Sequence, residues 1–178
     1  MKSLILKLFF TIGLLLSANK SAFAEAISKI MVLDFQLNDL TDLPNPPEEL
    51  ARINYLSTIF KQNLADNKIE IVPVNDKIKD EMSKNSATYL FDHTDVAVDL
   101  AKDSGADYII IGVAMKPTFL FVYPRLLMVD IKSKRKAFTT YVQLEGSWSE
   151  KNTTANSGVM LANKVIDYLK DMKNQICN

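Results

Sequence analysis

Hydrophobic residues between positions 107 and 148 follow a pattern typical of three consecutive strands. The first, Asp107 to Met115, is apolar at both even and odd positions, as a strand buried on both faces of a sheet requires. The second, Phe119 to Lys132, and the third, Ala137 to Trp148, are joined by a short basic turn, which predicts an antiparallel hairpin. We therefore expect the first strand to lie in the interior of a sheet.

The third strand alternates apolar with polar positions, so one of its faces is predicted to be buried and the other to face water. The apolar positions are Phe138, Val142, Leu144 and Trp148. The positions on the wet face are Thr139, Tyr141, Gln143, Glu145 and Ser147. This is typical of an antiparallel strand that is covered on one side.

The N-terminal half predicts a strand, a helix and a second strand. Ile27 to Leu37 is apolar and β-branched around its centre, and a proline-bearing loop follows it. Pro47 is predicted to begin a helix that runs to Asp66, with Glu48 and Glu49 in its first turn. Its apolar positions recur at three and four: Leu50, Ile53, Leu56, Phe60 and Leu64. Ile69 to Pro73 completes a βαβ unit with parallel strands and a right-handed crossover.

Three further helices are predicted. Residues 75–86 form a polar one, and residues 92–105 form another that is capped by Asp92 or Thr94 and ends at Gly105. Thr153 to Ile176 forms a long C-terminal helix with one apolar face: Val159, Ala162, Ile166, Leu169 and Met172. Together these elements predict a single α/β domain with a mixed five-stranded sheet packed with amphipathic helices.

Residues 1–24 have the three parts of a secretory signal peptide. Lys2 and Lys7 carry positive charge, Leu8 to Leu16 form a short apolar run, and Ala22-Phe-Ala24 is a small-x-small cleavage site. The apolar run is shorter than the roughly 20 residues that a membrane helix needs. We expect removal of the signal, an exported domain of residues 25–178 without stable membrane insertion, and a periplasmic or secreted location.

Charge and cysteine content narrow the classes further. The whole chain has 21 basic and 21 acidic residues, and the signal peptide removes three lysines, so the remaining domain carries a net charge of about −3. Such a surface offers no broad basic footprint for nucleic acid. Cys177, the single cysteine, is expected to be a free thiol near the terminus, with an intermolecular disulfide as the alternative.

Two short stretches carry a family resemblance. The run Ile30-Met-Val-Leu-Asp-Phe35 ends a strand in Asp-Phe, and Gly105-Ala-Asp-Tyr-Ile-Ile-Ile-Gly112 enters a strand through Ala-Asp-Tyr. This order resembles a group of uncharacterised secreted bacterial α/β proteins and, more distantly, the N-terminal domain of TolB and the CsgG-like domain. The resemblance implies a mixed-sheet domain of the cell envelope that works by binding partner proteins. It implies neither pore formation nor membership of the Tol complex.

Candidate chemistry is sparse. His93, the single histidine, stands beside Asp92, and Asp34 ends the first strand, where open α/β sheets bind ligands. These three residues define one hypothesis, a small secreted hydrolase or ligand-binding protein. A metal site needs three or four convergent ligands, and a phosphate loop needs glycines that the loop after the first strand lacks. We therefore expect no cofactor, no metal and no catalytic residue, and we favour a binding protein over an enzyme.

The stretch Lys116 to Pro124 is the stronger candidate for a binding surface. Phe119, Phe121 and Tyr123 lie on one side of it, and Pro124 suggests that this part of the strand is at an edge or leaves the sheet. Aromatic residues at a sheet edge favour addition of another chain. The basic turn is a second candidate, for phosphate head groups or an acidic partner: Lys132, Lys134, Arg135 and Lys136. The alternatives are that the aromatic stretch packs in the core and that the basic turn is only solvated. The sequence thus predicts a non-catalytic adaptor that binds an envelope protein through residues 119–123 or through the proline-bearing loop.

Overall fold

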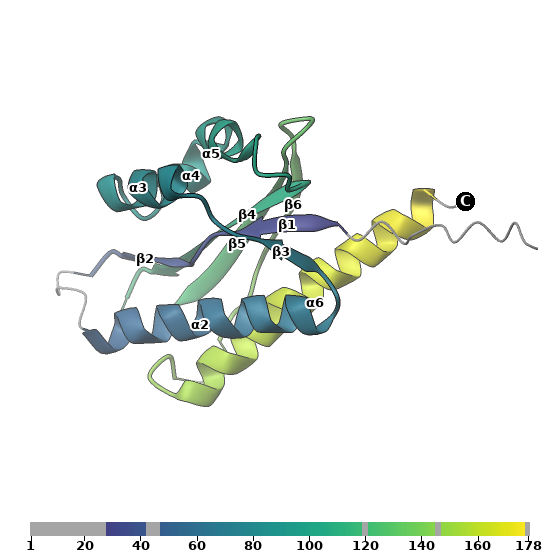
Figure 1. The fold of residues 1–178 in the computed structure, drawn as a ribbon. Helices are drawn as coiled ribbons and strands as arrows, with labels where there is room; N and C mark the ends of the chain where they lie inside the picture. Colours follow the sequence, from purple (N-terminus) through teal and green to yellow (C-terminus); the bar gives the residue numbers. More distant parts are fainter. Residues whose placement is uncertain (1–27, 42–46, 119–120, 145–146, 177–178) are drawn as a thin grey trace, which may run out of the picture.

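The computed structural model describes residues 28–41, 47–118, 121–144 and 147–176. The predicted signal peptide, Phe119 and Cys177 lie outside these ranges. The described residues form one mixed sheet of six strands between two helical layers (Figure 1). Helices α2 (Pro47–Asp66) and α6 (Lys151–Ile176) cover one face, and α3 (Asp76–Lys84), α4 (Tyr89–Asp92) and α5 (Thr94–Ala101) lie on the other. The predicted α/β class and mixed sheet are confirmed.

The strand order along the sheet is β3-β1-β4-β5-β6, with β2 also paired to β4. The strands are β1 (Lys29–Val32), β2 (Gln36–Asp39), β3 (Glu70–Val72), β4 (Tyr108–Lys116), β5 (Tyr123–Asp130) and β6 (Lys136–Tyr141). β1 is parallel to β3 and β4, as the predicted βαβ unit requires, while β5 is antiparallel to both β4 and β6. The hairpin and the interior position of β4 are confirmed.

The first predicted strand is divided into two. β1 and β2 pair with successive parts of β4, but the register shifts by one residue between Val32, opposite Ile110, and Gln36, opposite Val113. The extra residue is a bulge. Within it the N–H of Phe35 leaves the sheet and donates to Ser57 Oγ on α2, at 2.8 Å in a buried setting. This bulge explains why the sheet has six strands where the sequence predicts five.

The last strand is shorter than predicted, and Pro124 supplies the reason. Pro124 lies inside β5, opposite Ala114 of β4, and β6 pairs with β5 from the next residue, Arg125, onward, so β5 is an inner strand and not the predicted edge. The N–H of Val142 donates to the carbonyl of Pro124 at 3.0 Å, but proline has no N–H with which to return the bond. The ladder therefore stops, and β6 ends at Tyr141 although Val142 and Trp148 are still buried.

Helices α2 and α6 bury mostly the predicted faces. On α2 the buried residues are Ile53, Leu56, Ser57, Phe60 and Leu64, and Pro47 begins the helix as expected. Leu50, in the first turn of α2, was predicted to be on this face but is 47% exposed. On α6 the face is turned slightly from the prediction: Leu161, Ala162, Val165 and Ile166 are buried, whereas Val159 is half-buried.

The helices of the other layer begin and end differently from the prediction. α3 follows Asn75, whose Oδ1 accepts from the N–H of Ile78 at 3.0 Å and so caps the helix. Asp92 ends α4, and the N-cap of α5 is His93, without a side-chain capping bond; the predicted caps Asp92 and Thr94 are therefore wrong. α5 ends at Ala101, and Gly105 then has a φ of +79° in the turn that leads to β4.

Among the described residues, no helix is long and apolar enough to cross a membrane.

Candidate functional site

Three aromatic rings lie on the outer part of the sheet, on the face that carries α3 to α5. Phe121 and Tyr123 stack with their ring centroids 6.3 Å apart, and Tyr141 faces the same side from β6, opposite Arg125. Phe121 is 49% exposed and Tyr141 62% exposed. Large apolar side chains are usually buried, so neighbouring exposed rings mark a candidate binding surface.

Arg125 gives this surface a fixed positive charge. Its guanidinium lies over the ring of Phe91 on α4, 4.2 Å from the ring centroid, in a cation–π contact. Phe91 is buried, so it anchors an arginine that is itself exposed. We call the surface formed by Phe121, Tyr123, Arg125, Thr139 and Tyr141 the aromatic face.

The aromatic face is hollowed rather than flat. A cavity of about 560 Å³ is lined by Met115, Tyr123, Arg125, Thr139, Thr140 and Tyr141. Tyrosine and arginine are enriched in the energetically important parts of protein interfaces, because each combines a large apolar surface with a polar group. The arrangement is therefore suited to receive a side chain from another protein.

The structure places the predicted binding residues in different environments. Phe121 and Tyr123 belong to the aromatic face, but Pro124 is buried and contributes nothing to that surface. Phe119 lies outside the described residues. Tyr141 was not predicted as a binding residue, although its position on the wet face of the third strand was the signal that could have identified it.

The predicted basic turn connects β5 to β6. Lys132, Lys134, Arg135 and Lys136 are all exposed, and Lys134 has a φ of 58° that closes the turn. Lys134 Nζ also pairs with Asp99 on α5 at 2.7 Å. Its hydrogen bond and its charge lower the pKa of Asp99. The turn thus has one cation tied to the helical layer and three that point to solvent.

The residues of the enzymatic hypothesis do not come together. Asp34 pairs with Lys61 of α2 at 2.7 Å and lines a hollow with Gln36, Val74, Lys79, Met82 and Ser83, which includes neither Asp92 nor His93. His93 stacks on Tyr89, with ring centroids 4.5 Å apart, and its Nδ1 lies 3.0 Å from the carbonyl oxygen of Tyr89. The arrangement provides no acid–base pair for a hydrolase.

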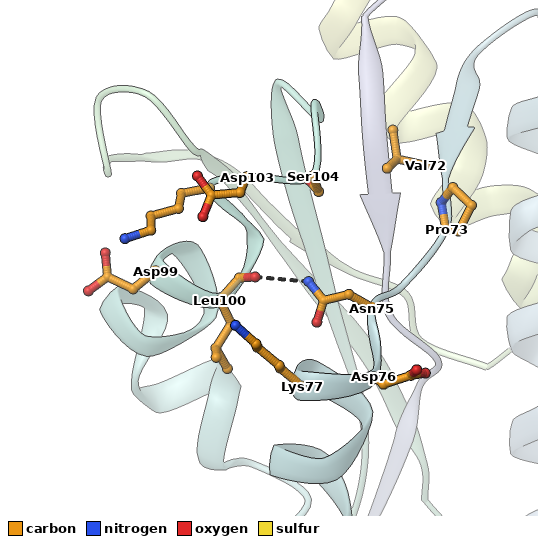
Figure 2. A pocket seen from close by; sticks show the side chains of 10 residues that line it. Val72, Pro73, Asn75, Asp76, Lys77, Asp99, Leu100, Asp103 and Ser104 are labelled. Carbon is orange, nitrogen blue, oxygen red and sulfur yellow. Dashed lines mark hydrogen bonds between the residues drawn. The ribbon is translucent and has the colours of Figure 1, made fainter.

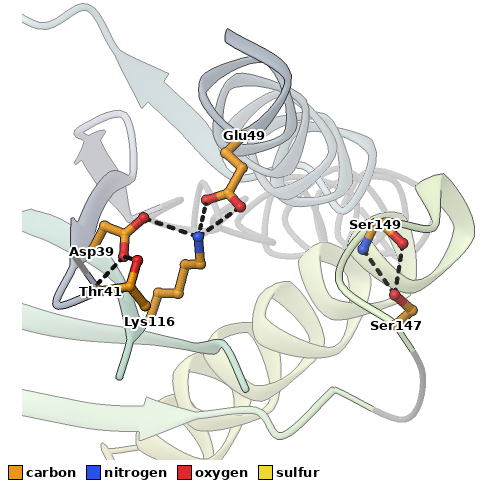
Figure 3. A network of polar contacts seen from close by, with 6 residues as sticks. All are labelled: Asp39, Thr41, Glu49, Lys116, Ser147 and Ser149. Atoms are coloured by element: carbon orange, nitrogen blue, oxygen red, sulfur yellow. Dashed lines mark hydrogen bonds and ion pairs between the residues drawn. The ribbon is translucent and has the colours of Figure 1, made fainter. Parts of the chain in front are cut away.

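A buried ionic cluster, which the sequence analysis missed, ties β2, β4 and α2 together (Figure 3). Lys116 Nζ lies 2.9 Å from Asp39 Oδ2 and 2.7 Å from Glu49 Oε1, with 4% and 3% of the Lys116 and Asp39 side chains exposed. Thr41 donates both its N–H and its hydroxyl to Asp39 Oδ1. The charges satisfy one another, which is the form in which ions are tolerated in a core.

The pKa values of the cluster follow from these contacts. Burial alone would raise the pKa of Asp39, but hydrogen bonds from Thr41 and Lys116 lower it below its ordinary value. Burial likewise opposes the charged form of Lys116, yet the hydrogen bonds to Glu49 and Asp39 raise its pKa. Asp39 and Lys116 are thus held in their charged forms, and the cluster is a structural tie between β2, β4 and α2.

Another hollow, of about 710 Å³, opens between the end of β3 and the helices α3 and α5 (Figure 2). Asn75 stands in it, but its Nδ2 donates to the carbonyl of Leu100 at 2.9 Å and its Oδ1 caps α3. Asp99, also on its wall, is paired with Lys134. Its polar groups therefore serve the fold. Among the described residues, no group of three or more His, Cys, Asp or Glu side chains could hold a metal ion.

The model of the DUF3280 family, described as "Protein of unknown function (DUF2380)", matches residues 28–164. No curated protein matches the chain.

Solved structures show a distant likeness. The LpoB C-terminal domain from Salmonella enterica has a TM-score of 0.46 and 14% identity, covering 76% of this chain and 93% of that one. Lipoprotein GNA1162 from Neisseria meningitidis has a TM-score of 0.46 and 13% identity, covering 85% and 97%. TolB from Acinetobacter baumannii has a TM-score of 0.46 and 12% identity, covering 82% of this chain and 29% of that one. At these values no function is transferred.

Proposed function

The chain belongs to the DUF3280 family, whose function is unknown, and we propose that it is a non-catalytic exported protein that binds another protein of the cell envelope through the aromatic face. The observation that carries the proposal is the exposure of two aromatic rings: Tyr141 lines a hollow of about 560 Å³, and Phe121 stacks on Tyr123 in the wall of that hollow. Folding alone would favour burial of these rings, since each fully buried aromatic side chain contributes about 1.5 to 3 kcal/mol.

The strands and contacts that hold the aromatic face in place also favour binding. It is built on the rigid strands β5 and β6, and Arg125 is held by Phe91 rather than left free. Docking here requires less ordering of side chains, because Phe121 already stacks on Tyr123 and Arg125 already lies over Phe91. By contrast, Asp34 and His93 have separate structural partners, Lys61 and Tyr89, which gives the hydrolase hypothesis no geometric support.

The exported location is part of the proposal and rests on the signal-like residues 1–24. Fractionation of the source cells, followed by N-terminal sequencing of the purified protein, tests it. Recovery from the envelope with Glu25 as the first residue is expected. Recovery from the cytoplasm with Met1 retained would contradict it.

The test of binding is affinity capture from an envelope extract, with the full chain tagged at its C-terminus and captured proteins identified by mass spectrometry. A partner that is captured by the wild type and lost with Phe121→Asp supports the proposal. A folded Phe121→Asp protein that retains every captured protein overturns it.

A further inference from the structure

We propose that an extended acidic segment of the partner adds to the sheet as a new strand along the outer edge of β6. This inference rests on the proposed function, because it states how the partner lies beside the aromatic face. β6 is the last strand in the order of the described sheet, so one of its sides has no neighbouring strand. An edge of this kind is a template for strand addition.

The ladder geometry identifies the backbone groups that face the open edge. The bond from the N–H of Val142 to the carbonyl of Pro124 makes these two residues a hydrogen-bonded pair. Pairs alternate along an antiparallel ladder, so Thr139 and Tyr141 turn their N–H and C=O groups away from β5. Lys164 of α6 supports this assignment, because its Nζ reaches the carbonyl of Tyr141 from outside the sheet, at 3.0 Å.

The side chains beside this edge suit an added strand. Thr139 and Tyr141 lie on the aromatic face and line its hollow. Alternate side chains of a new strand would point to the same face of the sheet, next to these two. Backbone hydrogen bonds would then hold the segment, and the hollow would accept one of its apolar side chains. In known strand-addition complexes, main-chain bonds give affinity and such pockets give specificity.

The positive charges around the edge of β6 favour an acidic partner segment. Arg135 and Lys136 stand at one end of β6, and Lys164 and the exposed Arg125, which lies opposite Tyr141, stand at the other. A second copy of the chain pairing edge to edge would bring these cations together, which disfavours self-association. A carboxylate on an added strand would instead attract the Lys164 ammonium and release the carbonyl of Tyr141. The fitting partner is therefore a segment that alternates acidic and apolar residues.

The test uses the full chain and a capped peptide of about six residues that alternate glutamate with valine. A lysine–valine peptide of the same length is the matched probe for charge. Two variants separate the contribution of the Thr139 backbone from that of its side chain. Thr139→Ala removes only the hydroxyl, which donates to the carbonyl of Leu126. Thr139→Pro removes that hydroxyl and also the N–H that points outward from the sheet. Binding is measured by calorimetry, and folding by thermal denaturation.

We expect the acidic peptide to bind and the basic peptide not to bind. Thr139→Pro should weaken binding about tenfold relative to Thr139→Ala, as loss of one backbone hydrogen bond predicts. If Thr139→Pro does not fold, hydrogen exchange of the wild type decides: the Thr139 and Tyr141 amides should be protected when the peptide is bound.

Three results would overturn strand addition: no binding of the acidic peptide at about 1 mM, equal binding by the two Thr139 variants, or unchanged exchange of the Thr139 and Tyr141 amides in the complex. A failure of strand addition can be distinguished from a failure of the proposed binding function. If a captured partner is lost with Phe121→Asp but retained by a folded Thr139→Pro protein, the aromatic face stands as the binding site and the edge does not.

Discussion

The ring of Phe121 lies nearly parallel to that of Tyr123, with 14° between their planes and 6.3 Å between their centroids. This stack covers one side of Tyr123 and leaves about half of Phe121 exposed. Replacement of Phe121 by aspartate should abolish capture of the partner, because it removes the ring and adds a charge that the interface must desolvate. The free energy of unfolding should change by no more than about 0.5 kcal/mol, as for most surface positions.

Leu50→Asp is the matched control for Phe121→Asp. Leu50 is 47% exposed against 49% for Phe121, but it lies in the first turn of α2, away from the aromatic face. Quantitative mass spectrometry should show a partner retained by Leu50→Asp and lost from Phe121→Asp. Equal loss from both variants would mean that general surface hydrophobicity, not the aromatic face, drives the capture.

Lys116→Met should destabilise the fold strongly. It leaves Asp39 and Glu49 as facing carboxylates without their shared cation, and breaking a buried ion pair in this way costs about 3 to 5 kcal/mol. Urea denaturation measures the effect. Lys61→Met is the control, since it breaks an ion pair of the same 2.7 Å length to the exposed Asp34 and should cost about 1 kcal/mol or less. Similar losses in the two variants would refute a special role for burial.

The buried cluster also predicts an acid dependence of stability. The pKa of Asp39 is lowered in the folded protein, so its contribution is complete above the ordinary carboxyl pKa and is lost as the pH falls through the lowered one. Denaturation curves below about pH 4 should therefore show a steeper decline for the wild type than for Asp39→Asn. Parallel pH profiles would show that other carboxylates are responsible.

Gly112→Ala should destabilise the protein because of one aromatic ring. A Cβ at this position in β4 would lie 2.5 Å from Cδ1 of Phe35, so the ring or the strand must move, at a cost of about 1 to 3 kcal/mol. Phe35→Ala removes the obstacle while creating a cavity of its own. In a double-mutant cycle the combined variant should therefore be more stable than the two single losses predict. Additive losses would place the strain elsewhere.

His93→Ala should leave partner capture unchanged. Its ring stacks on Tyr89 and bonds locally to the same residue, and it shares no hollow with Asp34. Capture by His93→Ala is compared with that by wild type under identical conditions. A loss of function in a folded His93→Ala protein would revive the ligand-binding alternative.

The parts of the fold that depend on local pattern were predictable. Each of these parts has a hydrophobic pattern that repeats at short spacing along the chain: the apolar run of β4, the alternation of β6 and the helical periodicity of α2. The bulge before β2 was not predictable, because it depends on the N–H of Phe35 finding Ser57, 22 positions away. The end of β6 was missed for a similar reason: Pro124 acts on Val142 across the hairpin.

The candidate site was predictable in part. Phe121 and Tyr123 stood out as aromatic residues in one segment, and the structure places both on the exposed face. Tyr141 joins them only through strand pairing, and Arg125 is held there by Phe91 of α4. The buried cluster of Lys116 was invisible for the same reason, since its two carboxylates, Asp39 and Glu49, come from distant parts of the sequence.

Because of the bulge between β1 and β2, the number of residues in this segment decides which side chains face each layer. Before it, even-numbered Ile30 and Val32 face the layer of α2 and α6; after it, odd-numbered Phe35 and Leu37 do so. Leu33, also odd, faces the opposite layer. The one extra residue changes which parity faces that layer: with the same sequence and no bulge, regular alternation from Val32 would point Asp34 and Gln36 toward α2 and α6, and Phe35 and Leu37 away from their own core. Here the number of residues encodes the structure as firmly as their identity.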